Sequence, residues 1–254
     1  MSAQQQNFRL RIAYAKQGRG RFLSHLEVQR ALTRMVRRAD LPYAVSQGFN
    51  PQMRLATGPA LSVGVSGERE YCDLILNTYV KPACALQQLR SVENSYLPVL
   101  DAAYVGLKDK ALNAAVVAQE ICVTIEDAPV EANQQALQAG LAKLRARNTL
   151  EIEHKGKMKV YDSATHVPKD IKVATEDSVL QMTLILRISN QGSLRPDALI
   201  QLLWQAADLA SPFAPAGTNS AGTSSGKGSD IGMYRMDRIA LYMEDSDGNL
   251  HLPL

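Results

Sequence analysis

The sequence contains little cysteine and no arrangement of cysteines that suggests a metal centre. Cys72, Cys84 and Cys122 are far apart and odd in number. Without a C-x-x-C pair, neither a zinc knuckle nor a disulfide framework is expected. The C-x-x-x-C-x-x-C spacing that would hold an iron–sulfur cluster for radical chemistry is also missing, and the four histidines have no metal-ligand spacing. We therefore expect that the chain itself holds no metal and no cofactor.

Long apolar runs are missing as well. No stretch approaches the roughly 20 apolar residues that a membrane-spanning helix needs. The N-terminal residues, MSAQQQNFRLRIAY, lack the apolar core of a secretory signal. The chain has 254 residues, of which 46% are apolar and 21% charged, a composition typical of globular proteins. We expect a cytoplasmic protein without a membrane partner, formed by one large domain or by two of roughly 100–150 residues.

Acidic side chains are scarce near the N-terminus. From Arg9 to Arg54 the chain has ten lysines and arginines against Glu27 and Asp40, a balance of +8. Because the whole chain carries only +3, the remainder is negative by about five charges. This asymmetry indicates an anionic partner for the first segment, although a solvated basic face would have the same composition.

The first part of the chain predicts the element order β-α-β-β-α-β over residues 8–107. Residues 8–15 alternate apolar and basic side chains, as a half-buried strand does. Ser24 and Glu27 have the spacing of an N-terminal capping box, and a helix should follow over residues 25–39. This order is that of a ferredoxin-like domain.

A similar series follows over residues 112–245, with strand residues at 149–162 and a longer insert near 162–177. The sequence therefore predicts an α+β protein with two tandem ferredoxin-like halves and antiparallel sheets, with domains at 8–107 and 112–254. Residues 214–232 are rich in glycine and serine and should form a loop. Their SSGKGS segment lacks the spacing of a phosphate-binding P-loop.

The first helix has a polar face made almost entirely of arginine. Its arginines at 30, 34, 37 and 38 fall within one sector of the helical wheel, opposite the apolar residues. Like charges at this spacing are mildly destabilising in isolation, and the planar guanidinium group suits phosphate. The segments KQGRGR and SQGFNPQMR add further cations, hydrogen-bonding groups and an aromatic ring. The candidate RNA- or anion-binding residues are Lys16, Arg19, Arg21, Arg30, Arg34, Arg37, Arg38, Gln47, Phe49, Asn50 and Arg54.

The GFNP segment and His25 could also have purely structural roles. The segment GFNP could be a structural turn in which Asn50 bonds the backbone and Phe49 enters the core. His25 takes the first position of the helix, where the helix dipole favours the neutral imidazole. It could have a structural role, contact a ligand, or act as a general acid or base.

The segments FLSH (22–25) and QGFNP (47–51), with the basic helix between them, resemble the radical-SAM-linked domain of unknown function. In that bacterial family the domain occurs alone or fused to radical SAM proteins. The resemblance implies a radical SAM protein as partner and RNA as the substrate. Two positions depart from the family: Glu27 replaces the usual aspartate, and Gln52-Met53 replaces a His-Pro pair. The expected architecture also looks like that of the RAMP-superfamily endoribonucleases, a likeness of fold alone.

Three functions remain open at this stage. The first is a non-catalytic RNA-binding or substrate-presenting protein that works with a radical SAM enzyme, in RNA modification or processing. The second is a protein-interaction scaffold whose arginine helix docks an acidic partner. The third is a metal-independent endoribonuclease that uses His25 as its general acid or base.

Overall fold

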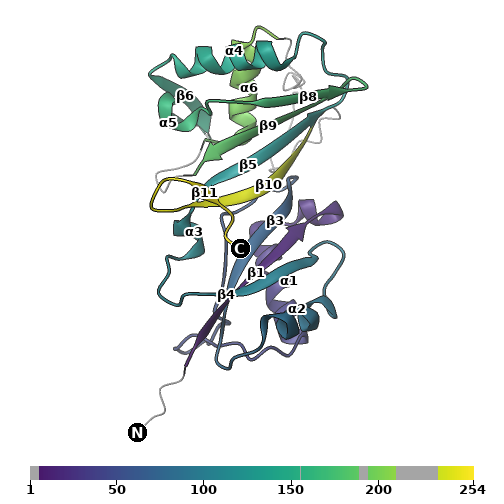
Figure 1. The fold of residues 1–254 in the computed structure, drawn as a ribbon, viewed down its shortest axis with the longest axis vertical. Coiled ribbons are helices and arrows are strands. Elements are labelled where there is room, and N and C mark those ends of the chain that lie inside the picture. The colour runs from purple at the N-terminus through teal and green to yellow at the C-terminus, as the bar shows by residue number, and fades with distance from the viewer. Residues whose placement is uncertain (1–5, 155, 189–193, 210–233) are drawn as a thin grey trace. The chain divides into compact units, whose positions relative to one another are not determined.

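The protein has an α+β fold (Figure 1). The structure, a computed structural model, describes residues 6–154, 156–188, 194–209 and 234–254. It divides into two compact units, one of Met1–Val116 with Ala240–Leu254 and one of Val117–Ile239. The sequence predicts a second domain over 112–254, whereas the structure groups the last fifteen residues with the first unit. No helix in the described ranges is long and apolar enough to cross a membrane.

The first unit is built on an antiparallel sheet. Its central strand β1 (Phe8–Lys16) pairs with β3 (Ser66–Leu76) on one edge and with β4 (Val99–Val105) on the other. The short strand β2 (Leu55–Thr57) pairs with β3, so the strand order is β4-β1-β3-β2. The element order of this unit is the β-α-β-β-α-β that the sequence predicts.

Two longer α-helices and one short 3-10 helix pack with this sheet in the first unit. The 3-10 helix η1 (Gly18–Phe22) leads into α1 (His25–Arg38), and α2 (Pro82–Arg90) follows β3. The predicted start of α1 is confirmed, because the reciprocal capping box is present at its N-terminus. The apolar face of α1 packs in a core with residues of β1, β3 and α2. Its arginine face is therefore turned away from the core.

Strand β1 differs from the predicted half-buried strand because both of its faces are covered. Arg9 and Arg11 are buried, and both guanidinium groups bind Asp73 of β3, at 2.6 and 2.7 Å. Arg11 Nη1 also donates to the carbonyl oxygen of Pro253, at 3.3 Å. This bond helps to explain why the C-terminal residues belong to the first unit.

The second unit contains three strands paired in the order β5-β9-β8, all antiparallel. These are β5 (Val116–Ile125), β9 (Val179–Arg187) and β8 (Lys172–Glu176). Strand β10 (Tyr234–Glu244) begins in this unit and ends in the first, where β11 (Leu250–His251) pairs with it.

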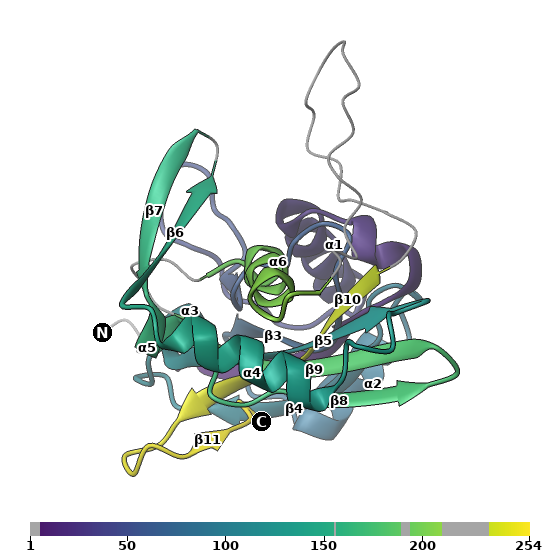
Figure 2. The same cartoon turned by 90° about the horizontal axis from the view of Figure 1, so that it is seen from above.

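The two longer helices of the second unit pack directly against each other. Figure 2 shows α4 (Gln134–Arg145) beside α6 (Pro196–Ala206). A Cβ atom at Gly140 would lie 3.1 Å from Leu203 Cδ1, so the glycine permits this close approach. Two short helices, α3 (Leu112–Ala115) and α5 (Ser163–His166), lie at connections.

The predicted assignment of residues 149–177 is wrong in one respect. The hairpin of β6 (Thr149–His154) and β7 (Lys157–Asp162) forms a separate two-stranded sheet. The strand that pairs with β9 is β8, which lies in the segment expected as an insert. Most residues of β7 are exposed, and an alternating pattern alone does not distinguish such a hairpin from a strand of the main sheet. The Gly/Ser-rich segment 214–232 lies outside the described residues.

Candidate functional site

Helix α1 presents a row of exposed arginines, which we call the arginine face: Arg30, Arg34, Arg37 and Arg38. The side chains at 34, 37 and 38 make no hydrogen bond or ion pair with the part of the chain that the structure describes. The row therefore keeps most of its positive charge toward solvent. An anionic partner would find these guanidinium donors available.

The N-terminus of α1 is fixed by its own capping box. The backbone N–H of Ser24 donates to Glu27 Oε2 at 2.8 Å, and the Ser24 hydroxyl donates to the same oxygen at 2.7 Å. These hydrogen bonds, and then the charge of Arg30, hold the pKa of Glu27 below its usual value. Since the helix start is secured in this way, the arginine face is formed before any partner binds.

The 3-10 helix before α1 adds a cation and a ring. Arg19 is exposed, and the Arg21 guanidinium carbon lies 5.1 Å from the centroid of the Phe22 ring. Gly20 packs so tightly that a Cβ atom there would lie 2.8 Å from the carbonyl oxygen of Tyr96. Phe22 is 50% exposed, although it is not among the contact residues predicted from the sequence. Its position in the FLSH segment is the sequence feature that could have identified it as a contact residue.

The loop that contains GFNP is exposed and is anchored on β3. Phe49 is fully exposed, so the interpretation that places it in the core is wrong. Asn50 Oδ1 accepts a hydrogen bond from Gln52 Nε2 at 3.0 Å, a side-chain partner rather than the expected backbone group. Gln47 is exposed as well.

Arg54, at the end of this loop, is exposed, and its carbonyl oxygen accepts from the Ile75 N–H at 3.0 Å. The Ala44 N–H donates to Ile75 O at 2.8 Å. Both ends of the loop are thus held by the same residue of β3. The structure brings the four arginines of α1 onto one face, while the GFNP loop takes its position from the sheet.

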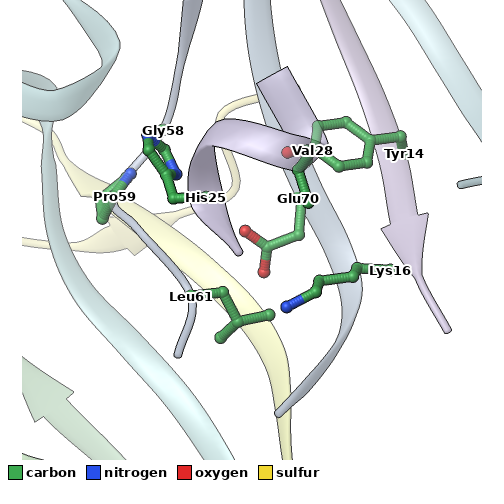
Figure 3. Close-up of a pocket in the computed structure, with 8 residues that line it drawn as sticks. All are labelled: Tyr14, Lys16, His25, Val28, Gly58, Pro59, Leu61 and Glu70. Carbon is green, nitrogen blue, oxygen red and sulfur yellow. The ribbon is translucent and has the colours of Figure 1, made fainter. Parts of the chain in front are cut away.

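Lys16 does not lie on the exposed turn that the sequence predicts for it. It is the last residue of β1, is 2% exposed, and its Nζ donates to the carbonyl oxygen of Ser62 at 3.4 Å. Its side chain lines a small pocket of the first unit (Figure 3). The lining residues are Tyr14, Lys16, His25, Val28, Gly58, Pro59, Leu61 and Glu70.

His25 lies at the edge of this pocket, half-buried. Its Nε2 is 3.2 Å from Thr57 Oγ1, within hydrogen-bond distance. The Thr57 hydroxyl therefore fixes the orientation of the ring, which gives His25 a structural partner. His25 also lines the pocket, where Figure 3 shows its ring beside Gly58 and Pro59.

A family profile described as an uncharacterized protein conserved in bacteria (DUF2344) matches residues 9–196. The chain belongs to this bacterial family. No curated protein sequence matches the chain. The matched region contains the arginine face, the GFNP loop and the pocket, and it ends where α6 begins.

Glu70, like Phe22, is not among the candidate residues predicted from the sequence. It is 4% exposed and lies opposite Tyr14 in the register of β3 and β1. Figure 3 shows its carboxylate and the Lys16 ammonium group extending into the same space. Alternation along GEREYCDLIL gives Glu68 and Glu70 the same face, yet Glu68 is exposed. The sequence therefore held no signal that separates the two glutamates.

Proposed function

We propose that the chain is a non-catalytic RNA-binding or substrate-presenting protein that works with a radical SAM enzyme in RNA modification or processing. The observation that carries this proposal is the arginine face of α1. Three of its four guanidinium groups have no hydrogen-bond or ion-pair partner among the described residues, and the fourth, Arg30, acts on Glu27 of the cap through its charge. A helix that needed only solubility would usually mix charges of both signs.

The dimensions of the arginine face suit a nucleic-acid strand. From Arg30 to Arg38 the helix rises about 12 Å, at 1.5 Å per residue. Phosphates of a stacked strand advance by about 3.4 Å. The face can therefore meet about four consecutive phosphates, and guanidinium groups bind phosphate oxygens with two parallel hydrogen bonds.

Two exposed aromatic rings favour RNA over a simple polyanion. Phe22 follows the cations of η1, and Phe49 extends from the GFNP loop. Proteins that bind single-stranded RNA commonly stack unpaired bases on such rings. An acidic protein surface has no unpaired bases that could stack on these rings.

The radical SAM partner is proposed from the family resemblance and from the chain's own cysteines. Cys72 is buried, and burial strongly raises the pKa of its thiol, which disfavours the thiolate that binds iron. The sequence has no closely spaced group of cysteines that could replace it. The iron–sulfur cluster of such chemistry would therefore belong to the partner.

Binding of fluorescent single-stranded RNA, followed by anisotropy, tests the RNA proposal. We expect binding that weakens with added salt and with Arg34→Glu, while Arg147→Glu on the second unit serves as control. Absence of binding would refute the proposal. An affinity purification that recovers an acidic protein after nuclease treatment, and loses it with Arg34→Glu, would support the scaffold function instead.

Incubation of the same RNA with the protein in EDTA tests whether the protein lacks ribonuclease activity. We expect the RNA to stay intact. Cleavage that His25→Ala abolishes would establish the endoribonuclease function instead.

We infer further that both units are ferredoxin-like. The order β4-β1-β3-β2 of the first unit supports this, as does the series β5, α4, β8, β9, α6, β10 of the second with the β6–β7 hairpin inserted.

A further inference from the structure

The pocket beside the N-terminus of α1 is too small for a base or a sugar ring. The space at its centre is about 10 Å³, close to the room that one water molecule needs. It can therefore admit one hydroxyl group or one terminal oxygen of a larger ligand. The rest of such a ligand would lie outside.

Two buried ionisable side chains face this small space. Lys16 and Glu70 are 2% and 4% exposed, and their charged ends extend toward the same side of the pocket (Figure 3). Burying a charged pair costs desolvation energy, and apolar residues of similar volume often stabilise a fold as well or better. A buried pair that borders a cavity is therefore a candidate for a functional site.

The strand is shaped to place the Glu70 carboxylate there. Gly67 lies three residues before it in β3, and a Cβ atom at Gly67 would come within 2.5 Å of Glu70 Oε1. The glycine leaves the room in which the carboxylate folds back toward Lys16. Any larger residue at position 67 would displace the carboxylate.

The chemistry of the pair matches a hydroxyl group better than a phosphate oxygen. An ionised carboxylate only accepts hydrogen bonds, and an ammonium group only donates them. A hydroxyl does both, so it can donate to Glu70 and accept from Lys16 at the same time. A phosphate oxygen would meet the negative charge of Glu70 without a proton to share.

We propose that this pocket binds the 2′-hydroxyl of a ribose and so distinguishes RNA from DNA. This inference rests on the proposed RNA-binding function. His25 is both the first residue of α1 and a wall of the pocket, so the pocket lies at the N-terminal end of the helix that carries the arginine face. The 2′-hydroxyl is the group by which a protein recognises RNA at a given site.

The test compares the affinities of a single-stranded RNA and of a DNA with the same sequence, using uracil in both. We expect the wild-type protein to prefer RNA by about tenfold or more, as the loss of a hydrogen bond to charged groups implies. Glu70→Gln should abolish most of this preference by weakening RNA alone. Gly67→Ala retains the Glu70 side chain but moves its carboxylate, and it should have the same effect. Glu68→Gln, at an exposed glutamate two residues earlier in the same strand, is the matched control and should change neither affinity.

The outcomes separate this inference from the function on which it rests. Equal affinity of the wild-type protein for RNA and DNA would refute 2′-hydroxyl recognition and leave the arginine face as a general nucleic-acid surface. Equal weakening of RNA and DNA by Glu70→Gln and Gly67→Ala would show that the pair only supports the fold. Binding of neither strand would refute both proposals. Thermal unfolding of each variant shows whether it is folded when measured.

Discussion

Removal of the positive charge of the arginine face should reduce the salt dependence of RNA binding by a calculable amount. The variant replaces Arg30, Arg34, Arg37 and Arg38 with glutamine. Glutamine favours the helix about as well as arginine, and the change removes like charges at i,i+4, so α1 should stay folded. The variant therefore changes the charge of the surface and little else.

The magnitude follows from counterion release. Each phosphate neutralised on a single strand contributes about 0.7 to the slope of log affinity against log salt concentration, so four arginines contribute about 2.8. Raising the salt from 50 to 200 mM should weaken the wild-type protein through these contacts by about 50-fold. The variant should lose this part of the dependence and bind weakly at both concentrations.

The assay is fluorescence anisotropy of a short single-stranded RNA over a salt series. The matched control replaces four exposed lysines of the second unit with glutamine and changes the net charge equally. These lysines are Lys157, Lys159, Lys169 and Lys172. If the control lowers the slope as much as the arginine variant does, net charge alone drives binding and the arginine face has no special role. A wild-type slope near zero would refute the reasoning altogether.

Four further predictions concern the fold. Ser24→Ala should lower the stability by about 1 kcal/mol in thermal or urea unfolding. The lowered pKa of Glu27 means that its stabilising effect is present above the unfolded pKa and is lost as the pH falls through the folded pKa. The difference between wild type and Glu27→Gln should therefore vanish in acid, and a constant difference would contradict this. Asp73→Asn should cost about 3–5 kcal/mol, because two buried guanidinium groups lose their counter-charge; a loss below 1 kcal/mol would show that they find other partners. A thiol reagent should modify exposed Cys84 quickly, and buried Cys72, whose pKa burial raises, only on unfolding; mass spectrometry of digested samples would show the order.

Features that depend on neighbouring residues could be predicted from the sequence. The capping box joins residues three apart, and the apolar and arginine faces of α1 follow from a period of 3.6 residues. Both were correct for this reason. The pairing of β8 with β9 could not be predicted, because β6, β7 and β8 all have strand-like patterns and only the packed fold decides which strand joins the main sheet.

Features that depend on distant partners were missed. Arg9 and Arg11 alternate with apolar residues as solvent-facing cations do, but their partner Asp73 is more than 60 residues away. Lys16 belongs to the same basic run, and its place beside Glu70 depends on the register of β1 against β3. Charge counting along the chain cannot distinguish a buried, paired cation from an exposed one.

Because Arg9, Arg11 and Lys16 are buried, fewer basic residues of the first segment can meet an anionic partner. Of the ten basic residues between 9 and 54, those that remain exposed are Arg19, Arg30, Arg34, Arg37, Arg38 and Arg54. If every one of the six met a phosphate of a single strand, the salt slope of the first unit would reach about 4.2. A measured slope well above that value would require cations of the second unit in the complex. A slope near 2.8 would instead identify the helix as the binding surface and leave η1 and the GFNP loop to contacts with bases.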